Sequence, residues 1–329
     1  MVTIRDVSKL SGCSVATVSR VINKSGYVSA DAKQAIQKAI KELNYKPNTI
    51  ARSLSGKKTY TVGLIIPDIM NPFFPEIARA IEDVASEIGY TVLLCNTDDN
   101  LQKEKNYIDV LQTKQVDGII IASYTIDEQQ ILNLYQDRFP VVVLDRIFHS
   151  SNIPAIVSKN REGSYIAVKH LIDQGCKKIA HIAGPFEVYA SRERFVGFEE
   201  ACKKNTCYLP SLISYQNGFH VSHGFDGMNE LLDKDSEIDG VFAGNDLMAL
   251  GALKALNKRG ISVPKDIKLV GFDNTSLSAM TIPSITTIKQ PIYEIGKRAM
   301  NTLLSIIDGK KVEKYVTELD VELIKRESS

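Results

Sequence analysis

Residues 3–23 read TIRDVSKLSGCSVATVSRVIN, and this stretch determines how the N-terminal segment folds. Thr3 followed three residues later by Asp6 is typical of a capping box, a reciprocal pair of hydrogen bonds that starts a helix. Gly12 permits a tight reversal of the chain, and Ser14 can cap a second helix directly after it. The stretch therefore predicts two short helices joined at a glycine turn.

A third helix is expected after the loop Asn23-Lys24-Ser25-Gly26, with Ser29 or Asp31 as its N-cap. Apolar residues recur at helical spacing in all three segments, so the segments can bury a shared core. Two helices joined at a glycine and closed by a third predict a helix-turn-helix domain. The residues expected to face its core are Ile4, Val7, Leu10, Val18, Val21, Ile22, Ile36, Ile40 and Leu43.

In a helix-turn-helix domain the second helix lies in the DNA major groove, with its N-terminal side chains toward the base edges. Val15 and Ala16 are at that end, and Arg20 can reach guanine O6 and N7 with its planar guanidinium. Short polar side chains suit phosphate oxygens, which position the protein without reading sequence. The alternative is a small bundle that binds another protein, with Arg20 as a solvated charge. The side chains expected at phosphates are Thr17, Ser19, Asn23 and Ser29.

The charge of the chain is distributed unevenly. The 329 residues carry a net charge of +1, which alone argues against a nucleic-acid partner. Residues 1–59, however, contain 11 Lys and Arg against 3 Asp and Glu, a local charge of +8. The remaining 29 basic and 36 acidic side chains give the rest of the chain a charge of −7. A cationic module joined to an anionic body indicates a polyanionic partner for the module, which favours DNA.

The sequence lacks the marks of an exported, membrane or metal-binding protein. No apolar run approaches the length of a membrane helix, and Arg5, Asp6 and Lys9 stand where a signal peptide would be apolar. The five cysteines form no C-x-x-C pair, so neither zinc nor disulfides are expected. We therefore expect a cytoplasmic protein with no membrane partner and no metal.

Enzyme signatures are also missing. Neither the phosphate-binding loop G-x-x-x-x-G-K-[ST] nor the dinucleotide fingerprint G-x-G-x-x-G occurs, and the five histidines form no H-E-x-x-H pair. No enzymatic activity and no cofactor are predicted. A free-standing sugar receptor for transport is the stronger rival, and the basic N-terminal module argues against it.

From Tyr60 onward, apolar strands alternate with amphipathic helices, a pattern typical of parallel sheets covered by helices on both faces. Both halves of this body begin with a strand, a loop and a long helix, which predicts two similar lobes rather than one large sheet. The expected strands are 61–66, 91–95, 118–122, 141–144, 178–182, 240–243 and 268–272, and the expected helices are 74–88, 102–114, 128–136, 163–174, 192–204, 221–232 and 247–259.

Polar and aromatic side chains follow the predicted strands of both lobes. Ligands of open α/β sheets bind beyond the carboxyl ends of the strands, so these side chains should meet in one cleft. Aromatic rings can stack on a sugar ring while carboxylates, amides and guanidinium groups pair with its hydroxyls, which favours a small polyhydroxylated ligand. Asp246 is expected to cap its helix rather than bind ligand, and Arg192 could be a structural ion-pair partner. Phe73 and Phe74 could be ordinary core.

Three motifs of the N-terminal segment resemble the DNA-binding head of the lac repressor (LacI/GalR) family: TIRDV at 3–7, ATVSRVIN at 16–23 and LNYKPN at 43–48. The segment NTIARSLSG at 48–56 resembles the hinge helix of that family and is too short to be stable alone in water. The resemblance implies that Leu54 inserts into the minor groove and kinks the duplex, and packing of Leu54 on the body is the alternative. The residues predicted to contact DNA are Thr3, Ser14, Val15, Ala16, Thr17, Ser19, Arg20, Asn23, Ser29, Ala51 and Leu54.

Residues 60 to about 325 resemble the effector domain of the same family and the periplasmic sugar-binding proteins. The motif NDLMALGA at 245–252 identifies this fold, whereas NPFF at 71–74, LDR at 144–146 and RER at 192–194 look like the ribose-binding proteins. The effector-binding residues that this resemblance implies are Asn71, Phe73, Phe74, Asp145, Arg146, Arg194, Phe219, Asn245, Asp273 and Gln290.

The sequence therefore predicts a DNA-binding transcriptional repressor of that family, with D-ribose as the expected effector. Another pentose, a purine or a phosphoprotein co-regulator are the alternatives. A homodimer is expected, because two symmetric heads match the half-sites of a palindromic operator.

The predicted fold is an all-α helix-turn-helix head followed by an α/β, two-lobed, periplasmic-binding-protein-like body with two doubly wound parallel sheets. The expected segments are 1–46 for the helix-turn-helix domain, 47–59 for the hinge helix and linker, and 60–329 for the effector-binding and dimerisation domain, with an N-lobe of about 60–160 plus 291–318 and a C-lobe of about 161–290 plus 319–329.

Overall fold

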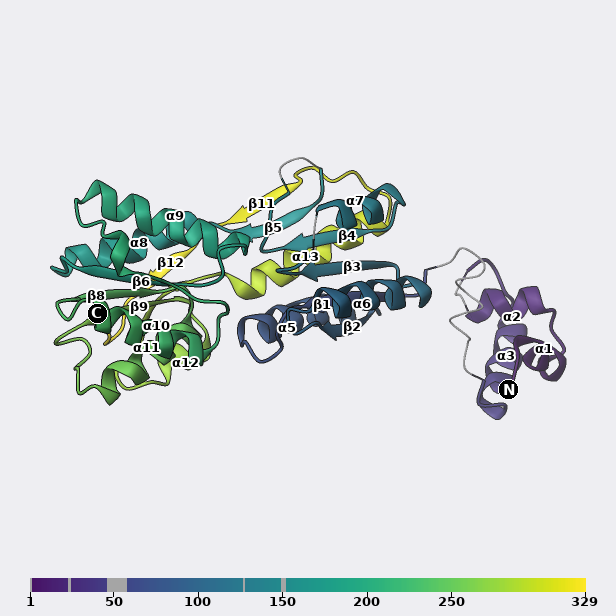
Figure 1. The fold of residues 1–329 in the computed structure, drawn as a ribbon. Helices are drawn as coiled ribbons and strands as arrows, with labels where there is room; N and C mark the ends of the chain where they lie inside the picture. The colour runs from purple at the N-terminus through teal and green to yellow at the C-terminus, as the bar shows by residue number, and fades with distance from the viewer. Residues whose placement is uncertain (1, 23–24, 46–57, 127, 149–151) are drawn as a thin grey trace. The chain divides into compact units, whose positions relative to one another are not determined.

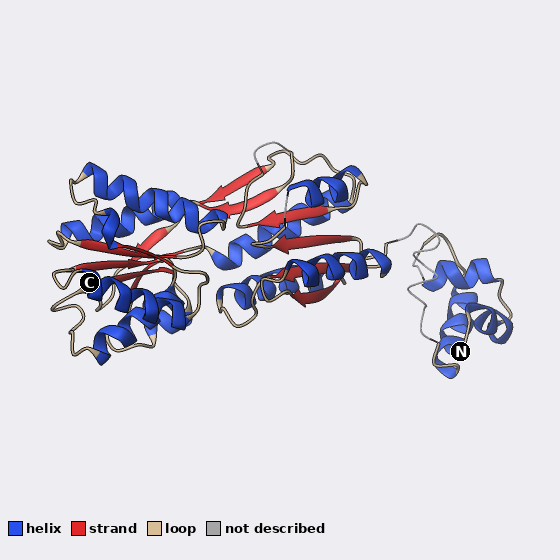
Figure 2. Ribbon diagram, viewed as in Figure 1, coloured by secondary structure: helices blue, strands red, loops and turns tan. Residues whose placement is uncertain are grey.

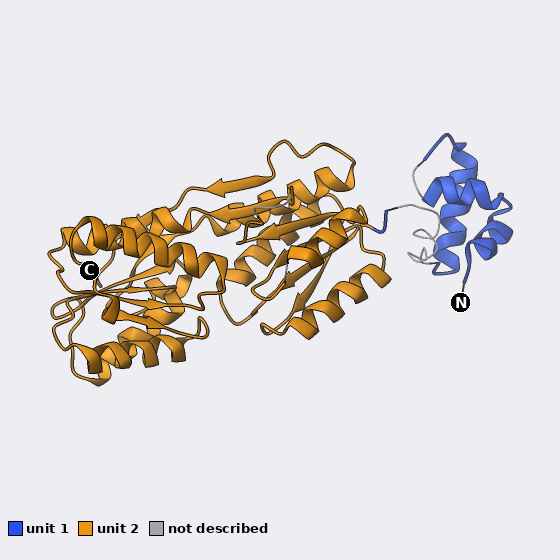
Figure 3. Cartoon of the chain, turned by 45° about the horizontal axis from the view of Figure 1, so that its top comes forward, with its two compact units in different colours: residues 1–59 blue, residues 60–329 orange. Residues whose placement is uncertain are grey.

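The computed structural model describes residues 2–22, 25–45, 58–126, 128–148 and 152–329. It separates into two compact units, Met1–Thr59 and Tyr60–Ser329 (Figure 3). We call the first unit the head and the second the body. Asn23, Ala51 and Leu54, all predicted to contact DNA, lie outside the described residues.

The head contains three described helices, α1 (Ile4–Ser11), α2 (Val15–Ile22) and α3 (Ala30–Glu42) (Figure 1). The predicted capping box starts α1, because Thr3 donates to Asp6 Oδ2 from its backbone N at 2.8 Å and from its Oγ1 at 2.7 Å.

Side-chain caps also start the other two helices of the head. Ser14 Oγ accepts from the backbone N of Thr17 at 3.1 Å, and Ser29 Oγ accepts from the backbone N of Ala32 at 3.4 Å. Gly12 lies between α1 and α2 with φ +66°, the left-handed conformation that glycine adopts without strain. The helix-turn-helix prediction is confirmed.

A small apolar core holds the three helices together. Val7, Val18 and Ile36 come from one helix each and are fully buried. The prediction for Leu10 was wrong, since its side chain is 46% exposed. Successive residues are about 100° apart around a helix, so Leu10 is turned roughly 120° away from Ile4 and cannot share its buried face.

The body contains two six-stranded sheets, which confirms the predicted fold class. Their strand orders are β11-β5-β4-β3-β1-β2 and β12-β10-β9-β8-β6-β7, and every pairing is parallel except that of β12 with β10. We call the lobes that contain them the N-lobe and the C-lobe. The N-lobe strands are β1 (Thr61–Ile66), β2 (Thr91–Asn96), β3 (Gly118–Ala122), β4 (Val141–Leu144), β5 (Ala155–Ser158) and β11 (Val316–Leu319). The C-lobe strands are β6 (Ile179–Ala183), β7 (Ile213–Tyr215), β8 (Gly240–Ala243), β9 (Lys268–Asp273), β10 (Thr286–Lys289) and β12 (Glu322–Ile324).

Helices cover both faces of each sheet (Figure 2). In the N-lobe, α5 and α13 pack against one face and α6 and α7 against the other. In the C-lobe, α10 and α11 cover one face and α8 and α9 the other. None of the described helices is both long enough and apolar enough to cross a membrane. The body helices are α5 (Phe73–Glu87), α6 (Leu101–Thr113), α7 (Glu128–Gln136), α8 (Asn160–Asp173), α9 (Tyr189–Lys204), α10 (Val221–Lys234), α11 (Asp246–Lys258), α12 (Ser276–Ala279) and α13 (Ile292–Ile307), with a 3-10 turn at Pro210–Leu212.

The chain passes between the lobes three times: from β5 to α8, from β10 to α13, and from β11 to β12. The sequence analysis did not identify the elements β5, β7, β10, β11, β12, α12 and α13. Five of these are strands of three or four residues, which are too short for an alternating pattern to stand out. The 16-residue helix α13 is different, because Ile292, Ile295 and Ala299 recur at helical spacing and the helix could have been predicted.

Candidate effector site and DNA-reading surface

The exposed surface of α2 carries the side chains predicted to read DNA. Val15, Ala16 and Arg20 are exposed, while Val18 on the opposite face is buried in the head core. The exposed Arg20 guanidinium, with small side chains on the same helix, is free of steric obstruction for a bidentate contact with guanine.

The hydroxyls predicted to contact phosphates are partly used inside the head. Thr3 Oγ1 donates to Asp6, and the hydroxyls of Ser14 and Thr17 lie 2.9 Å apart within hydrogen-bond distance. Ser29 Oγ accepts from α3 and keeps its own proton to donate. The structure therefore gives the Thr3 hydroxyl a helix-capping role, whereas the Ser29 hydroxyl can both cap α3 and donate to a phosphate.

A small cavity of about 20 Å³ lies where the strands of both lobes end. Eight of the ten predicted effector-binding residues line it, together with three that were not predicted. The lining residues are Asn71, Phe73, Tyr124, Asp145, Val188, Ala190, Arg194, Phe219, Asn245, Asp273 and Gln290.

Arg194 is the central cation of this cavity and is only 5% exposed. Its Nε donates to Asn160 Oδ1 at 2.8 Å and its Nη1 donates to the carbonyl of Gly244 at 2.7 Å. Its Nη2 lies 3.4 Å from Asp273 Oδ1, and its guanidinium lies 3.9 Å above the ring of Phe272. These contacts hold the guanidinium in one orientation before any ligand binds.

Two carboxyl groups share the cavity with Arg194, that of the buried Asp273 and that of the half-buried Asp145. Burial raises the pKa of Asp145 to about 6 and the pKa of Asp273 to about 7, although Arg194 opposes both increases. Gln290 Nε2 also donates to Asp273 Oδ1 at 2.7 Å. A ligand that donated hydroxyl hydrogens to these oxygens would stabilise their charged forms, which is what a sugar can do.

Asn245 lines the cavity as predicted and is also the residue that caps α11, the role expected of Asp246. Asn245 is the N-cap of α11, because its Oδ1 accepts from the backbone N of Met248 at 2.8 Å. Asp246 is fully buried and accepts from Thr275 N at 2.7 Å and from Thr287 Oγ1 at 2.6 Å. The prediction that Asp246 caps α11 was wrong, since the preceding residue has the extended backbone of an N-cap.

Phe74 and Arg146 are the two predicted effector-binding residues that do not line the cavity. Phe74 is 1% exposed and belongs to the N-lobe core, with its ring edge-on to Phe73 at 5.1 Å between centroids. Arg146 Nη1 donates to the carbonyl of Ile126 at 2.6 Å, and its guanidinium lies 4.8 Å from the ring centroid of Phe148. Neighbours in sequence point in different directions here, so only one member of each pair reaches the cavity.

Tyr124 is the lining residue that sequence reasoning should have found. It lies two residues after the end of β3, much as Asp145 directly follows β4. The strand-end rule that identified Asp145 applies equally to Tyr124. Val188 and Ala190 carry no such signal, because small apolar side chains at the start of a helix are common.

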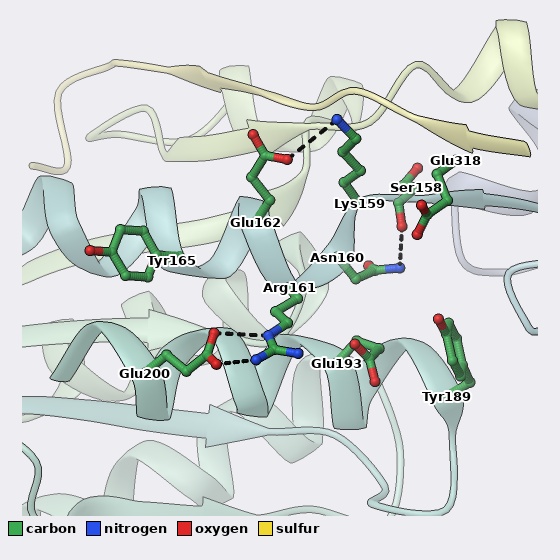
Figure 4. A pocket seen from close by; sticks show the side chains of 10 residues that line it. All are labelled: Ser158, Lys159, Asn160, Arg161, Glu162, Tyr165, Tyr189, Glu193, Glu200 and Glu318. Carbon is green, nitrogen blue, oxygen red and sulfur yellow. Dashed lines mark hydrogen bonds and ion pairs between the residues drawn. The ribbon is translucent and has the colours of Figure 1, made fainter. Parts of the chain in front are cut away.

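A larger cavity of about 500 Å³ lies where the chain passes from β5 into α8 (Figure 4). Four of its charged side chains already pair with one another: Arg161 Nε donates to Glu200 at 2.8 Å, and Lys159 Nζ lies 3.5 Å from Glu162. The smaller cavity therefore matches the predicted effector site better, because it combines buried aromatic, carboxylate, amide and guanidinium groups at the strand ends. No group of three or more His, Cys, Asp or Glu in the part of the chain that the structure describes could hold a metal ion.

Comparisons with known proteins agree on one family. Residues 3–48 match the bacterial regulatory proteins of the lacI family, and residues 168–329 match the periplasmic binding protein-like domain. The chain is 44% identical over 329 residues to the ribose operon repressor of Halalkalibacterium halodurans, covering 100% of this chain and 97% of that protein. It is 38% identical to the repressor PurR of Histophilus somni, covering 100% of this chain and 99% of that protein.

A solved structure extends this similarity to the three-dimensional fold. The crystal structure of the lac repressor dimer bound to operator and the anti-inducer ONPF superposes with a TM-score of 0.89 at 30% identity, covering 99% of this chain and 98% of that one. The head and the body therefore both have their counterparts in a repressor seen on DNA.

Proposed function

This chain belongs to the lacI family of bacterial regulatory proteins, a DNA-binding repressor with an effector-binding body, and we propose that the effector is D-ribose. The family consists of regulators and not enzymes. The observation that carries the proposal is the convergence of eight predicted sugar-binding side chains on one cavity. The 44% identity to a ribose operon repressor supports the same effector.

The proposed binding mode assigns a task to each kind of side chain. Phe73 and Phe219 stack against the sugar ring, Arg194 donates to its oxygens, and Asp145 and Asp273 accept from its hydroxyls. The caps and ion pairs that already fix these groups mean that little ordering is needed on binding, which favours affinity.

We propose that the chain binds a palindromic operator as a homodimer, with residues 1–46 reading the major groove and 47–59 forming the hinge. Sugar binding closes the N-lobe (about 60–160 plus 291–318) on the C-lobe (about 161–290 plus 319–329) and thereby changes operator affinity. The sugar can do this only through its differential affinity for the two arrangements.

The test is titration calorimetry of the full chain with D-ribose, D-xylose and hypoxanthine, followed by fluorescence polarisation on an operator selected from random duplexes. D-ribose should bind and should change operator affinity at least tenfold. The proposal fails if D-ribose leaves operator affinity unchanged while another of these compounds alters it.

A purine is the second candidate effector, because the chain is also 38% identical to a PurR repressor over its full length. The Phe73 and Phe219 rings that line the cavity offer aromatic faces for a planar base as well as for a sugar. The same titration distinguishes the two candidates, because a purine site binds hypoxanthine and a sugar site binds D-ribose. Binding of a base would depend chiefly on aromatic stacking, and binding of a sugar on Arg194 and the carboxylates.

A further inference from the structure

Asn160 lines the larger cavity and contacts the central cation of the smaller one. It is the first residue of α8, directly after the chain has passed from β5 into the C-lobe, and it is 2% exposed. In the larger cavity its side chain is hydrogen-bonded to Ser158 (Figure 4). Its Oδ1 accepts from Arg194 Nε at 2.8 Å. Asn160 therefore contacts a residue of the effector site although it does not line the smaller cavity.

The orientation of the Asn160 amide is fixed by two partners of opposite character. Arg194 Nε can only donate, so an oxygen must face it. The carbonyl of Ser158 can only accept, and Asn160 Nδ2 donates to it at 3.1 Å. Exchange of the amide oxygen and nitrogen would break both hydrogen bonds. An amide can serve the two partners at once, whereas an ionised carboxylate has no hydrogen to donate and an apolar side chain serves neither partner.

The helices that carry Asn160 and Arg194 are in close backbone contact. A Cβ atom built on Gly197 would overlap the carbonyl oxygen of Arg161, so α8 and α9 touch through their backbones at this point. Gly197 lies nearly one turn of α9 after Arg194, and Arg161 directly follows Asn160 in α8. This contact between the helices therefore fixes the distance across which the Asn160 amide reaches the guanidinium.

The hydrogen bonds that orient Arg194 lie within the C-lobe. The smaller cavity of about 20 Å³ has room for about one water molecule and is too small for a pentose. The lobes must therefore move apart before a sugar can enter. Asn160, Arg194 and Gly244 all belong to the C-lobe, so their hydrogen bonds do not have to break during that motion.

The orientation of a guanidinium determines which hydroxyl groups it can bind. The group is planar, and its donors form a fixed fork that matches acceptors lying in the same plane. The hydrogen bonds of Arg194 to Asn160 and to the Gly244 carbonyl fix that plane at two different nitrogens. Two pentoses that differ in the configuration of one hydroxyl, such as D-ribose and D-xylose, present different acceptors to the fixed plane.

We propose that Asn160 is a positioning residue that makes the effector site selective for the arrangement of the sugar hydroxyls. It holds the plane of Arg194 in place and does not touch the sugar. The proposal rests on the proposed sugar site, because it explains how that site distinguishes one pentose from another. A purely structural residue would lower the apparent affinity for every sugar by the same factor, since only the fraction of competent protein would change.

Titration calorimetry of the full chain with D-ribose and D-xylose tests this, and the measured quantity is the ratio of the two dissociation constants in each variant. Asn160→Leu is similar in size and removes the acceptor of Arg194 Nε. It should weaken D-ribose binding about tenfold, the effect of one lost buried hydrogen bond, and reduce the preference for D-ribose about threefold. Asn160→Asp keeps an oxygen opposite Arg194 Nε and should retain the preference.

Asn205→Leu is the matched control. Asn205 is the C-cap of the helix that carries Arg194, and its Nδ2 donates to the carbonyl of Ala201 at 2.8 Å. The substitution removes one amide hydrogen bond at the other end of α9 and should leave the preference unchanged. An unchanged preference in Asn160→Leu, or an equal loss of preference in Asn160→Asp or Asn205→Leu, would overturn the proposal.

Thermal unfolding without sugar separates this proposal from the proposed effector. Asn160→Leu and Arg194→Met remove the same contact, so the melting temperature of the double variant should fall by less than the sum of the two single effects. Asn205→Leu combined with Arg194→Met should give an additive fall. If neither pentose binds the unaltered chain, D-ribose is rejected as the effector and a non-additive fall still shows that Asn160 holds Arg194. An additive fall for Asn160→Leu with Arg194→Met would reject the positioning role itself.

Discussion

The head and the body place their functional side chains in opposite surroundings. In the head, Val15, Ala16 and Arg20 are exposed on α2, and the residues that stabilise the fold lie on its other face. In the body, most candidate effector residues are buried, and Asp273 contacts both Gln290 and Arg194, which is only 5% exposed. Function and stability can therefore be changed separately in the head, whereas in the body each change affects both.

The largest expected effect is that of Arg194→Ala. It removes the contacts of the guanidinium to Asn160, Gly244 and Asp273 inside the body, so it should abolish sugar binding and lower the free energy of unfolding by about 3 kcal/mol. Calorimetry and urea unfolding measure the two effects. Arg192→Ala on the exposed side of the same helix is the control, and equal losses in both variants would contradict the central role of Arg194.

Arg20→Ala should separate function from stability in the head. Loss of a bidentate guanine contact weakens operator binding by roughly 1–3 kcal/mol, while an exposed substitution changes the stability by less than about 0.5 kcal/mol. Polarisation on the selected operator and thermal unfolding of the full chain give both values. Lys33→Ala removes the same charge from exposed α3 and should weaken operator and nonspecific DNA equally, unlike Arg20→Ala.

The pH dependence of the body should reveal its buried carboxyl groups. Because burial raises the pKa of Asp145 to about 6 and that of Asp273 to about 7, the folded body retains protons that the unfolded chain releases above about pH 4. Their contribution to stability therefore decreases as the pH rises from about 4 to about 7. Asp273→Asn should flatten that decline and raise the melting temperature at pH 8 by a few degrees while weakening sugar binding.

Asp137→Asn, an exposed change in the same body, controls for the loss of one negative charge. A melting temperature that falls with Asp273→Asn at pH 8 would mean that the charged Asp273 stabilises the empty body, and the comparison between head and body would need revision.

The smallest expected effect is that of Ser14→Ala at the start of α2. Thr17 N loses its acceptor, which costs about 1 kcal/mol in helices of this kind. Hydrogen exchange of the α2 amides in the full chain should become several-fold faster, with the body amides unchanged. If the body amides also exchanged faster, the separation between the two units would not hold.

The sequence was sufficient for the parts of the molecule that follow local rules. The capping box at Thr3 and the strand ends before Asp145 and Asn245 depend on residues close in sequence, and the structure places them as predicted. The sequence was insufficient for predicting which of two neighbouring side chains points into the cavity. Asp145 has φ +56°, and the Arg146 side chain that follows donates to the Ile126 carbonyl instead of lining the cavity, which the residue order alone does not reveal.

Contacts between the lobes were also beyond the reach of the sequence. Phe219 and Tyr124 are about a hundred positions apart, and their meeting depends on how one lobe closes against the other. The same is true of Asp68 and His220, since neither belongs to a motif with a known spacing.

The three passages of the chain between the lobes also set the order in which the body can be completed during synthesis. The N-lobe sheet lacks an edge strand until β11 has been made, and the C-lobe sheet lacks one until β12 has followed it a few residues later. Domains usually fold one by one while the ribosome elongates the chain. Here the edge strands that complete the two lobes are translated only a few residues apart, so both lobes are completed at nearly the same time. The head is translated first and has its own core, so a nascent chain carries a folded DNA-binding unit long before it carries a body able to respond to an effector.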